Sequence, residues 1–352
     1  MSKKIMIVFG TRPEAIKLAS IIKEFHNRGI KPILVNTGQH RDMIEEVLNL
    51  FKINVDFNLK IMETKQSLSK ITRKILEKLD KIIKYCNPDI IITLGDTNTS
   101  FGAALCGFYN KIKLVHIEAG PRSYNKYDAF PEEINRVLLD HMADLNFCQT
   151  ENDIIHLKAE NIYNGVFVGN TSLDAINYFV TKPTTSNQIL ITMHRREGWG
   201  LPMKRACIAI KELAIHNPNH KFIITRHPNP IVYDTITTIL GQYSNISLLD
   251  NLPFDEFIRL LAQSKFAMTD SGGVIQEAIF LKKPVIHLRE KSEYEYLFDG
   301  TFLVSVGKDR NKILESAQKL IDMENPHSDN IGEFGDGTAG KKIVEYILGE
   351  NK

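Results

Sequence analysis

The feature that most constrains this chain is a repeated alternation of short apolar runs with longer amphipathic segments. The apolar runs are rich in Ile, Val and Leu without polar alternation, which is typical of strands buried on both faces of a parallel sheet. The segments between them, such as 68–85 and 254–264, have helical spacing. This alternation predicts a parallel α/β architecture. The expected strands are 5–9, 32–36, 89–94, 113–117, 145–148, 166–168, 188–192, 222–225, 246–249, 266–269, 284–288 and 302–306.

The length and the order of these runs predict two domains. The chain has 352 residues, of which 43% are apolar, which is enough for two buried cores. Six expected strands lie on each side of the polar stretch 181–187, which reads as a linker. We expect two doubly wound, Rossmann-like domains that face each other across a cleft. The first spans 1–180 and the second 181–338, and a last helix begins at about 339.

Composition excludes several classes of function. The 44 Lys and Arg residues nearly balance the 42 Asp and Glu residues, which argues against nucleic-acid binding through a broad basic surface. The chain contains no apolar stretch of about 18 residues for a membrane helix, and its first apolar run is too short for a signal peptide. The four cysteines lie far apart, and no cluster has metal-ligand spacing. We therefore expect a cytoplasmic protein with buried thiols and no metal.

In open α/β sheets ligands bind beyond the carboxyl ends of the strands, where this chain places its polar motifs. The segment 9–17 follows the first expected strand and reads FGTRPEAIK. Gly10 permits a tight turn, and Arg12 and Lys17 lie near the positive end of the next helix, which suits an anion. An ordinary strand-to-helix turn with solvated charges explains this segment equally well.

Three carboxylates follow later strands of the first half. Asp96, in GDTNTS, is best interpreted on its own as the cap of the next helix. Glu118, in HIEAG, ends a buried strand, where a carboxylate is costly unless it has a partner or a task. Glu132 and Arg136, in FPEEINR, share one helical face, where they suit either a site or a surface salt bridge.

The second half carries histidine motifs and a glycine motif. His194 in HRRE and His227 in RHPNP each lie beside an arginine, which suits phosphate, although a lone histidine is more often structural. The segment 269–277 reads TDSGGVIQE and begins a helix with bare N–H groups that suit a diphosphate. Glu277 lies one turn further on, within reach of a ribose. The chain has no GxGxxG motif to support a nicotinamide cofactor.

Together these motifs resemble those of the non-hydrolysing UDP-N-acetylglucosamine 2-epimerases. The order and spacing of the segments over nearly the whole chain make the resemblance specific. It implies a GT-B-like fold, a C-terminal helix at about 339–352 that packs back on the first domain, and a homodimer. The segments are GTRPEAIK, GQHRDM, GDTNTS, HIEAG, FPEEINR, VGNTSLDA, HRRE, RHPNP, TDSGG and GDG.

The resemblance implies reversible epimerisation of UDP-N-acetylglucosamine at carbon 2, without NAD or another cofactor. UDP leaves by anti elimination, a 2-acetamidoglucal forms, and UDP is added back to give UDP-N-acetylmannosamine. By motif, the catalytic residues are Asp96, Glu118, Glu132, His194, Lys17 and Arg136. The residues that bind UDP are Arg12, Phe257, Ser271, Gly272, Gly273, Glu277 and Arg289. The residues of an allosteric site for a second UDP-N-acetylglucosamine are Gln39, His40, Arg73, Arg195 and His227.

This chain departs from the family pattern at several positions. The segment 294–296 reads Tyr-Glu-Tyr where the family usually has Arg-Pro-Glu, and Asp42 stands where a Gln is usual. The departure at 294–296 leaves open a modified substrate, such as a UDP-diacetamido uronic acid, and the departure at Asp42 leaves open that activation by a second UDP-N-acetylglucosamine is weakened or absent. The motifs are also compatible with a hydrolysing epimerase, a GT-B glycosyltransferase or a UDP-sugar sensor without activity. They do not assign the acid and the base among the carboxylates.

Overall fold

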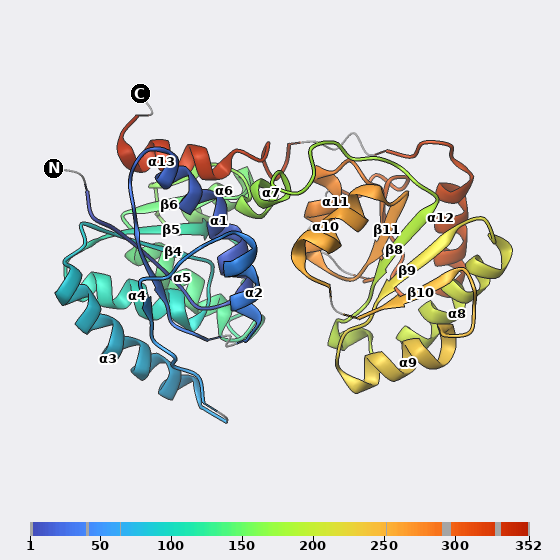
Figure 1. Ribbon diagram of the computed structural model, residues 1–352, viewed down its shortest axis with the longest axis horizontal. Coiled ribbons are helices and arrows are strands. Elements are labelled where there is room, and N and C mark those ends of the chain that lie inside the picture. The colour runs from blue at the N-terminus through green and yellow to red at the C-terminus, as the bar shows by residue number, and fades with distance from the viewer. Residues whose placement is uncertain are drawn as a thin grey trace. The chain divides into compact units, whose positions relative to one another are not determined.

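The computed structural model describes residues 3–39, 42–63, 65–250, 252–290, 297–327 and 332–350. The chain forms two compact units. Unit 1 comprises Met1–Ala175 together with Glu333–Lys352, and unit 2 comprises Ile176–Gly332. The C-terminal segment therefore belongs to the same unit as the N-terminus (Figure 1).

Unit 1 contains a seven-stranded sheet in the order β3-β2-β1-β4-β5-β6-β7, and all neighbouring strands are parallel. Its strands are β1 (Ile5–Phe9), β2 (Ile33–Asn36), β3 (Phe57–Asn58), β4 (Ile90–Leu94), β5 (Lys113–Ala119), β6 (Leu145–Cys148) and β7 (Gly165–Phe167). Its helices are α1 (Arg12–Asn27), α2 (Asp42–Leu50), α3 (Leu68–Cys86), α4 (Asn98–Tyr109), α5 (Glu132–Met142), α6 (Glu151–Ala159), α7 (Thr171–Ile176) and α13 (Ala339–Leu348).

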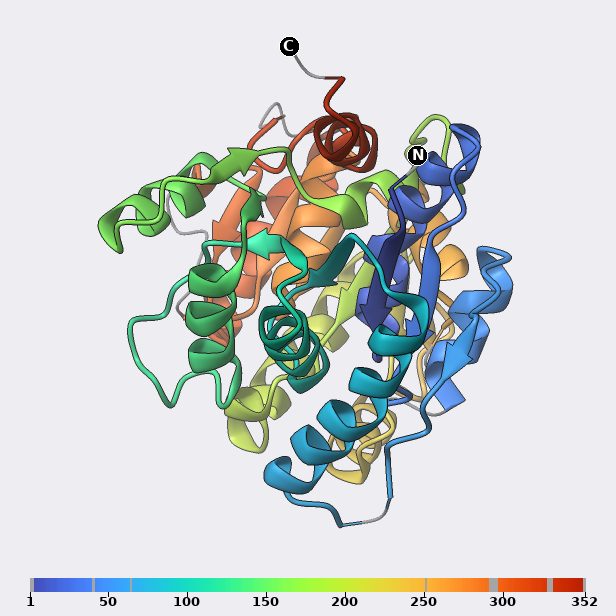
Figure 2. The ribbon, with the colours of Figure 1, turned by 90° about the vertical axis from the view of Figure 1, so that its left-hand side faces the viewer.

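Helices cover both faces of this sheet (Figures 1 and 2). Helix α3 packs with α4 against the face that carries Met6 and Val8 of β1. Its buried residues Ile71, Ile75 and Leu79 recur every four positions, so one apolar stripe of the helix faces the core. Helices α1 and α13 pack together on the opposite face, as Figure 1 shows.

Unit 2 contains a six-stranded parallel sheet in the order β10-β9-β8-β11-β12-β13. Helices α8, α9 and α12 cover one of its faces, and α10 and α11 cover the other (Figure 1). Its strands are β8 (Gln188–Thr192), β9 (Lys221–Thr225), β10 (Ile246–Leu249), β11 (Phe266–Thr269), β12 (Val285–His287) and β13 (Leu303–Ser305). Its helices are α8 (Leu201–His216), α9 (Pro230–Leu240), α10 (Phe254–Gln263), α11 (Gly272–Phe280) and α12 (Arg310–Asp322), with the 3-10 turn η1 (Arg196–Gly198).

The predicted fold class, with two doubly wound Rossmann-like units, is confirmed. Each of the twelve predicted strands is present, with ends within two residues of those expected. Strand β3 was not predicted, because a strand of two residues is too short to show a pattern. In both units the strand order reverses beside the first strand, between β1 and β4 and between β8 and β11. Ligands of doubly wound sheets bind at such switch points.

None of the helices in the described ranges is both long and apolar enough to span a membrane. All four cysteines are free thiols. Cys106, Cys148 and Cys207 are buried as expected, whereas Cys86 at the end of α3 is only half-buried.

Candidate functional site

The switch point of unit 1 is held together by Glu14, a buried residue that the motifs did not assign to the site. Its Oε2 accepts hydrogen bonds from the backbone N–H groups of Gly10 (2.9 Å) and Thr11 (2.7 Å). Its Oε1 accepts from the hydroxyls of Thr97 (2.8 Å) and Ser100 (3.0 Å). Burial raises the pKa of Glu14, and these donors oppose the increase. Glu14 thus joins the loop after β1 to the loop after β4.

Gly10 lies in the two-residue connection between β1 and α1, where it is needed for space. Gly10 does not have a positive φ. A Cβ at this position would lie 2.0 Å from Thr37 Oγ1 and 2.6 Å from Thr99 Oγ1. These two hydroxyls form a buried hydrogen bond of 2.8 Å directly against the glycine. A side chain here would therefore break the contact between Thr37, the residue after β2, and Thr99 of α4.

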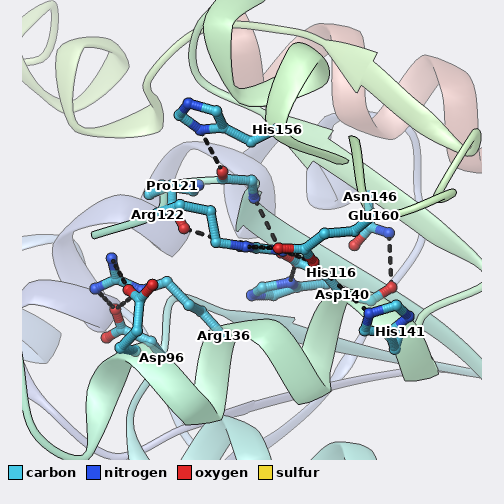
Figure 3. A network of polar contacts seen from close by, with 12 residues as sticks. Asp96, His116, Pro121, Arg122, Arg136, Asp140, His141, Asn146, His156 and Glu160 are labelled. Atoms are coloured by element: carbon cyan, nitrogen blue, oxygen red, sulfur yellow. Dashed lines mark hydrogen bonds and ion pairs between the residues drawn. The ribbon is translucent and has the colours of Figure 1, made fainter. Parts of the chain in front are cut away.

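Asp96 is paired with Arg136, so its interpretation as a helix cap is wrong. Thr97 caps α4, because its hydroxyl accepts from the N–H of Ser100 at 3.1 Å. Arg136 Nε lies 3.0 Å from Asp96 Oδ2, and Arg136 NH1 lies 3.4 Å from Glu133 Oε2 (Figure 3). The surface salt bridge considered for Glu132 and Arg136 is therefore absent.

Glu118 lies at a bulge at the end of β5. The register with β6 shifts between Ile117 and Ala119, and Glu118 has a φ of 68°. A positive φ is unfavourable for a side chain and is typical of functional positions, where bulges re-aim a residue. Lys17 Nζ contacts both carboxylate oxygens of Glu118 and lies 2.7 Å from Oε1.

The two ion pairs belong to one cluster. A Cβ at Gly95 would lie 3.8 Å from Glu118 Oε2, so the Glu118 carboxylate sits beside the residue before Asp96. Burial raises the pKa of Asp96, the charge of Glu118 adds to this, and Arg136 and Lys17 oppose it. Four residues that the motifs predicted separately, Lys17, Asp96, Glu118 and Arg136, thus meet at the switch point.

Two further predicted residues begin helices of unit 1. Arg12 is the first residue of α1 and is half-buried. Glu132 is the first residue of α5 and is also half-buried. Within the described ranges its carboxylate makes no hydrogen bond or ion pair, so the structure does not join it to the cluster.

The residues predicted for an allosteric site in unit 1 are not joined to one another by described contacts. Gln39 Oε1 accepts a hydrogen bond of 2.8 Å from Thr99 Oγ1. Arg73 is an exposed residue of α3 that pairs with Glu77 at 3.2 Å. His40 lies outside the described residues, as does the side chain of Asp42.

The switch point of unit 2 is organised by Asp270, another residue that the motifs contain but do not assign to a role. Asp270 is fully buried directly after β11. Its carboxylate accepts from the backbone N–H groups of His194 (3.0 Å) and Arg195 (3.2 Å). Lys308 Nζ lies 3.3 Å from the same carboxylate. Asp270 therefore fixes the loop after β8 to the loop after β11.

His194 and His227 lie together at this edge. Their rings are stacked with centroids 6.0 Å apart. Burial lowers the pKa of His194, the charge of Asp270 raises it, and Arg195 and His227 lower it further. The two histidines predicted from separate motifs thus face one another.

The N-terminus of α11 is open. Ser271 is the N-cap residue, but its hydroxyl makes no capping bond, and Gly273 is exposed. A Cβ at Gly273 would find only Ser271 Oγ, at 3.9 Å. The first N–H groups of a helix have no partner within the helix and favour an anion. Gly272 and Gly273 therefore present backbone donors, and Glu277 lies half-buried one turn further on.

Two other predicted residues lie on unit 2. Phe257 is a half-buried residue of α10. Arg289 follows β12, and its Nε lies 3.4 Å from Glu197 Oε1. The departure from the family pattern at 294–296 lies outside the described residues.

Two doubly wound units, each with polar motifs at its switch point, define a GT-B-like protein. The family model described as UDP-N-acetylglucosamine 2-epimerase matches residues 23–348. The chain therefore belongs to the UDP-N-acetylglucosamine 2-epimerase family.

Similar proteins span the same length. The UDP-N-acetylglucosamine 2-epimerase of Campylobacter jejuni is 37% identical, over 99% of this chain and 98% of its own. That of Bacillus subtilis is 38% identical, over 98% of this chain and 95% of its own. The crystal structure of UDP-GlcNAc 2-epimerase from Neisseria meningitidis bound to UDP-GlcNAc has a TM-score of 0.84 and 36% identity, over 98% of this chain and all of that one.

Proposed function

We propose that this protein interconverts UDP-N-acetylglucosamine and UDP-N-acetylmannosamine without hydrolysis. The observation that carries the proposal is the cluster in unit 1, where Glu118 pairs with Lys17 beside the pair of Asp96 and Arg136. Membership of the family supports it, as does the similar Neisseria meningitidis enzyme, which binds UDP-GlcNAc.

The proposed reaction is an anti elimination followed by its reverse on the other face of the sugar. A base removes the proton from carbon 2, the bond between carbon 1 and the diphosphate oxygen breaks, and UDP leaves with that electron pair. A double bond between carbons 1 and 2 forms 2-acetamidoglucal. A proton then adds to the opposite face of carbon 2, and the UDP oxygen returns to carbon 1. The overall reaction consumes no co-substrate, and its two proton transfers need two acid–base groups.

The residues of unit 1 suit these proton transfers. Burial and the charge of Glu118 raise the pKa of Asp96, which moves it towards the neutral range where acid–base catalysis is efficient. Lys17 and Arg136 supply positive charge to a site where negative charge develops as the proton leaves. The two transfers fall to two of the three carboxylates Asp96, Glu118 and Glu132.

Unit 2 supplies the groups for the leaving UDP. The N–H groups of α11, with Ser271, bind the diphosphate, because a helix N-terminus favours an anion. His194 lies at the same sheet edge and stabilises the charge of the leaving diphosphate. Phe257 stacks on uracil, Glu277 accepts from the ribose hydroxyls, and Arg289 adds positive charge, as does Arg12 of unit 1.

The residues of the predicted allosteric site bind a second UDP-N-acetylglucosamine as an activator. Arg195 and His227 lie at the switch point of unit 2, and Gln39 lies beside Gly10 in unit 1. Activation predicts a lag when the reaction starts from UDP-N-acetylmannosamine alone. A progress curve that is linear from its start in that direction would contradict an activator site.

The test is to incubate the protein with UDP-N-acetylglucosamine alone and to identify the products by NMR. The proposal predicts UDP-N-acetylmannosamine at equilibrium with the substrate. Free N-acetylmannosamine as the main product would show a hydrolysing enzyme, and turnover only with an acceptor sugar would show a glycosyltransferase. Turnover restricted to UDP-diacetamido uronic acids would show a modified substrate. UDP binding without any turnover would show a sensor.

A further inference from the structure

A buried network lies behind the cluster of unit 1 and is centred on His116 (Figure 3). His116 is on β5, two residues before Glu118, and its side chain is 1% exposed. Its Nδ1 lies 2.7 Å from Asp140 Oδ1. Its Nε2 lies 2.9 Å from the carbonyl oxygen of Gly95, the residue before Asp96. The imidazole therefore connects α5 to the loop that carries Asp96.

Asp140 is ionised in this arrangement. Its Oδ2 lies 2.7 Å from Arg122 NH1 and accepts the N–H of Gly120 at 3.2 Å. Burial raises the pKa of Asp140, but the hydrogen bonds and charges of His116 and Arg122 outweigh it, so the pKa is lowered. Arg122 is also buried and binds Glu160 through two parallel hydrogen bonds, of 2.7 and 2.8 Å.

The partners of His116 determine its protonation state. A carbonyl oxygen and an ionised carboxylate can only accept hydrogen bonds. A neutral imidazole has one N–H, so it would direct a lone pair at one of these two oxygens. Both contacts are satisfied only when both ring nitrogens carry a proton. In agreement, burial lowers the pKa of His116, but the hydrogen bond and charge of Asp140 outweigh it and raise the pKa overall.

We propose that His116 is a permanently charged positioning residue, an imidazolium that fixes the backbone of Gly95 and places a positive charge behind Asp96. The catalytic part of this inference rests on the proposed function, whereas the protonation state does not. The charged groups that act on the ring are Asp140 from α5 and Asp96 from the loop after β4, and Arg122 from the loop after β5 binds the other oxygen of the Asp140 carboxylate. His116 and Arg122 are the cations of this network, and Asp140 and the partly exposed Glu160 are their anionic partners.

The charge acts on Asp96. Burial and Glu118 both disfavour the ionised form of Asp96. An imidazolium behind the same loop favours the ionised form, because opposite charges attract strongly where water is excluded. His116 therefore opposes the increase in the pKa of Asp96 that burial and Glu118 cause.

The first arm of the test is NMR of the full chain with its histidines labelled with ¹⁵N. The His116 signals are assigned as those absent from His116→Gln or, should that variant not fold, by correlation with the backbone of the unmodified protein. The expected result is that both ring nitrogens stay protonated from pH 6 to pH 9. A single protonated nitrogen at pH 7 would overturn the inference.

The second arm is the pH dependence of kcat for His116→Gln. The limb of the pH profile that reports the titration of Asp96 is identified by its absence in Asp96→Asn. For His116→Gln we expect kcat to fall at least tenfold and this limb to move to higher pH. His156→Gln is the matched control, because His156 also contacts a glycine carbonyl after β5, Gly120 O at 3.0 Å, but lies far less buried. We expect the control to keep the unmodified profile.

The outcomes separate the two proposals. A fall in kcat without movement of the limb would show a purely structural role and would overturn the effect on Asp96. A lack of epimerase activity in the unmodified protein would contradict the proposed function and, with it, the catalytic role of His116. The NMR result would then still decide the protonation state.

Discussion

Lys17 Nζ lies 2.7 Å from Glu118 Oε1, although 101 positions separate the two residues in the sequence. The strand order explains this contact. Lys17 lies on the helix that follows β1, Glu118 ends β5, and only β4 separates these strands in the sheet. The parallel sheet therefore brings a cation and a carboxylate together at the carboxyl ends of its strands, with Asp96 from the loop after β4 beside them.

Glu118→Gln removes the charge and the proton-transfer capacity of this residue and keeps its shape. We expect kcat to fall by about 10²–10⁴-fold, which is the usual contribution of an acid–base group. The measurement is the initial rate of UDP-N-acetylmannosamine formation. Glu24→Gln is the control, because Glu24 of α1 and Arg28, the C-cap residue of this helix, form an ion pair of similar exposure, 20% for each side chain. A kcat within threefold of the unmodified value in Glu118→Gln would remove Glu118 from the mechanism.

Glu14→Ala removes the carboxylate that joins the two loops of the unit 1 site. The buried N–H groups of Gly10 and Thr11 lose their partner, at about 1–3 kcal/mol for each unsatisfied group. We expect the free energy of unfolding to fall by about 3 kcal/mol, and kcat to fall at least tenfold at temperatures where the variant is folded. Ser67→Ala, which removes the N-cap of α3, is the control and should cost about 1 kcal/mol without loss of kcat. Unchanged kcat in Glu14→Ala would show that the loops hold their geometry unaided.

Asp174 makes the stability of unit 1 depend on pH. It accepts the N–H groups of Ala339 (3.1 Å) and Gly340 (2.6 Å) at the start of α13, and burial raises its pKa from 3.8 to about 6. Because the folded state holds this proton more tightly than the unfolded state, stability falls as pH rises between about 4 and 6. At about 1.4 kcal/mol for each pK unit, the loss is about 2–3 kcal/mol.

Asp174→Asn should remove most of this decrease in the free energy of unfolding between about pH 4 and pH 6. The measurement is the free energy of unfolding in urea at pH 4.5 and at pH 7, for the variant and for the unmodified protein. Asp153, whose pKa is also raised to about 6 by burial, contributes equally to both proteins, so the difference between them isolates Asp174. Equal pH dependence in both proteins would contradict the assignment.

Gly273→Ala tests the diphosphate site of unit 2. The added methyl group fits the protein itself, because the nearest heavy atom is Ser271 Oγ at 3.9 Å. The methyl group would stand where a diphosphate approaches the start of α11. We expect an unchanged melting temperature and at least a tenfold weaker affinity for UDP by calorimetry, which corresponds to about 1.4 kcal/mol. Unchanged UDP affinity in a folded variant would place the diphosphate elsewhere.

Much of the fold could be predicted from the sequence, because strands buried on both faces are continuous apolar runs. The runs at 5–9 and 266–269 coincide with β1 and β11. A strand as short as β3 has no such signature, and it forms because Val35 of β2 offers a partner for Phe57.

The candidate site was only partly accessible from motifs. Lys17 and Glu118 could be selected from their positions next to strands, but their contact depends on strand order. The local pattern at Asp96 suggests a helix cap. Its partner Arg136 is not visible in this pattern, because it lies on a helix 40 positions away. Glu14 and Asp270 were missed because burial and several distant donors give these carboxylates their importance. The Thr11-x-x-Glu14 capping box was the one local signal for Glu14.

The most direct test of the central claim is the exchange of the proton on carbon 2. The protein is incubated with UDP-N-acetylglucosamine in deuterated water, without NAD, and both sugars are recovered and examined by NMR and mass spectrometry. The account predicts one deuterium at carbon 2 of UDP-N-acetylmannosamine, and the same label in recovered UDP-N-acetylglucosamine as equilibrium is reached. Conversion to UDP-N-acetylmannosamine without deuterium at carbon 2 would contradict proton removal by the Asp96 and Glu118 cluster.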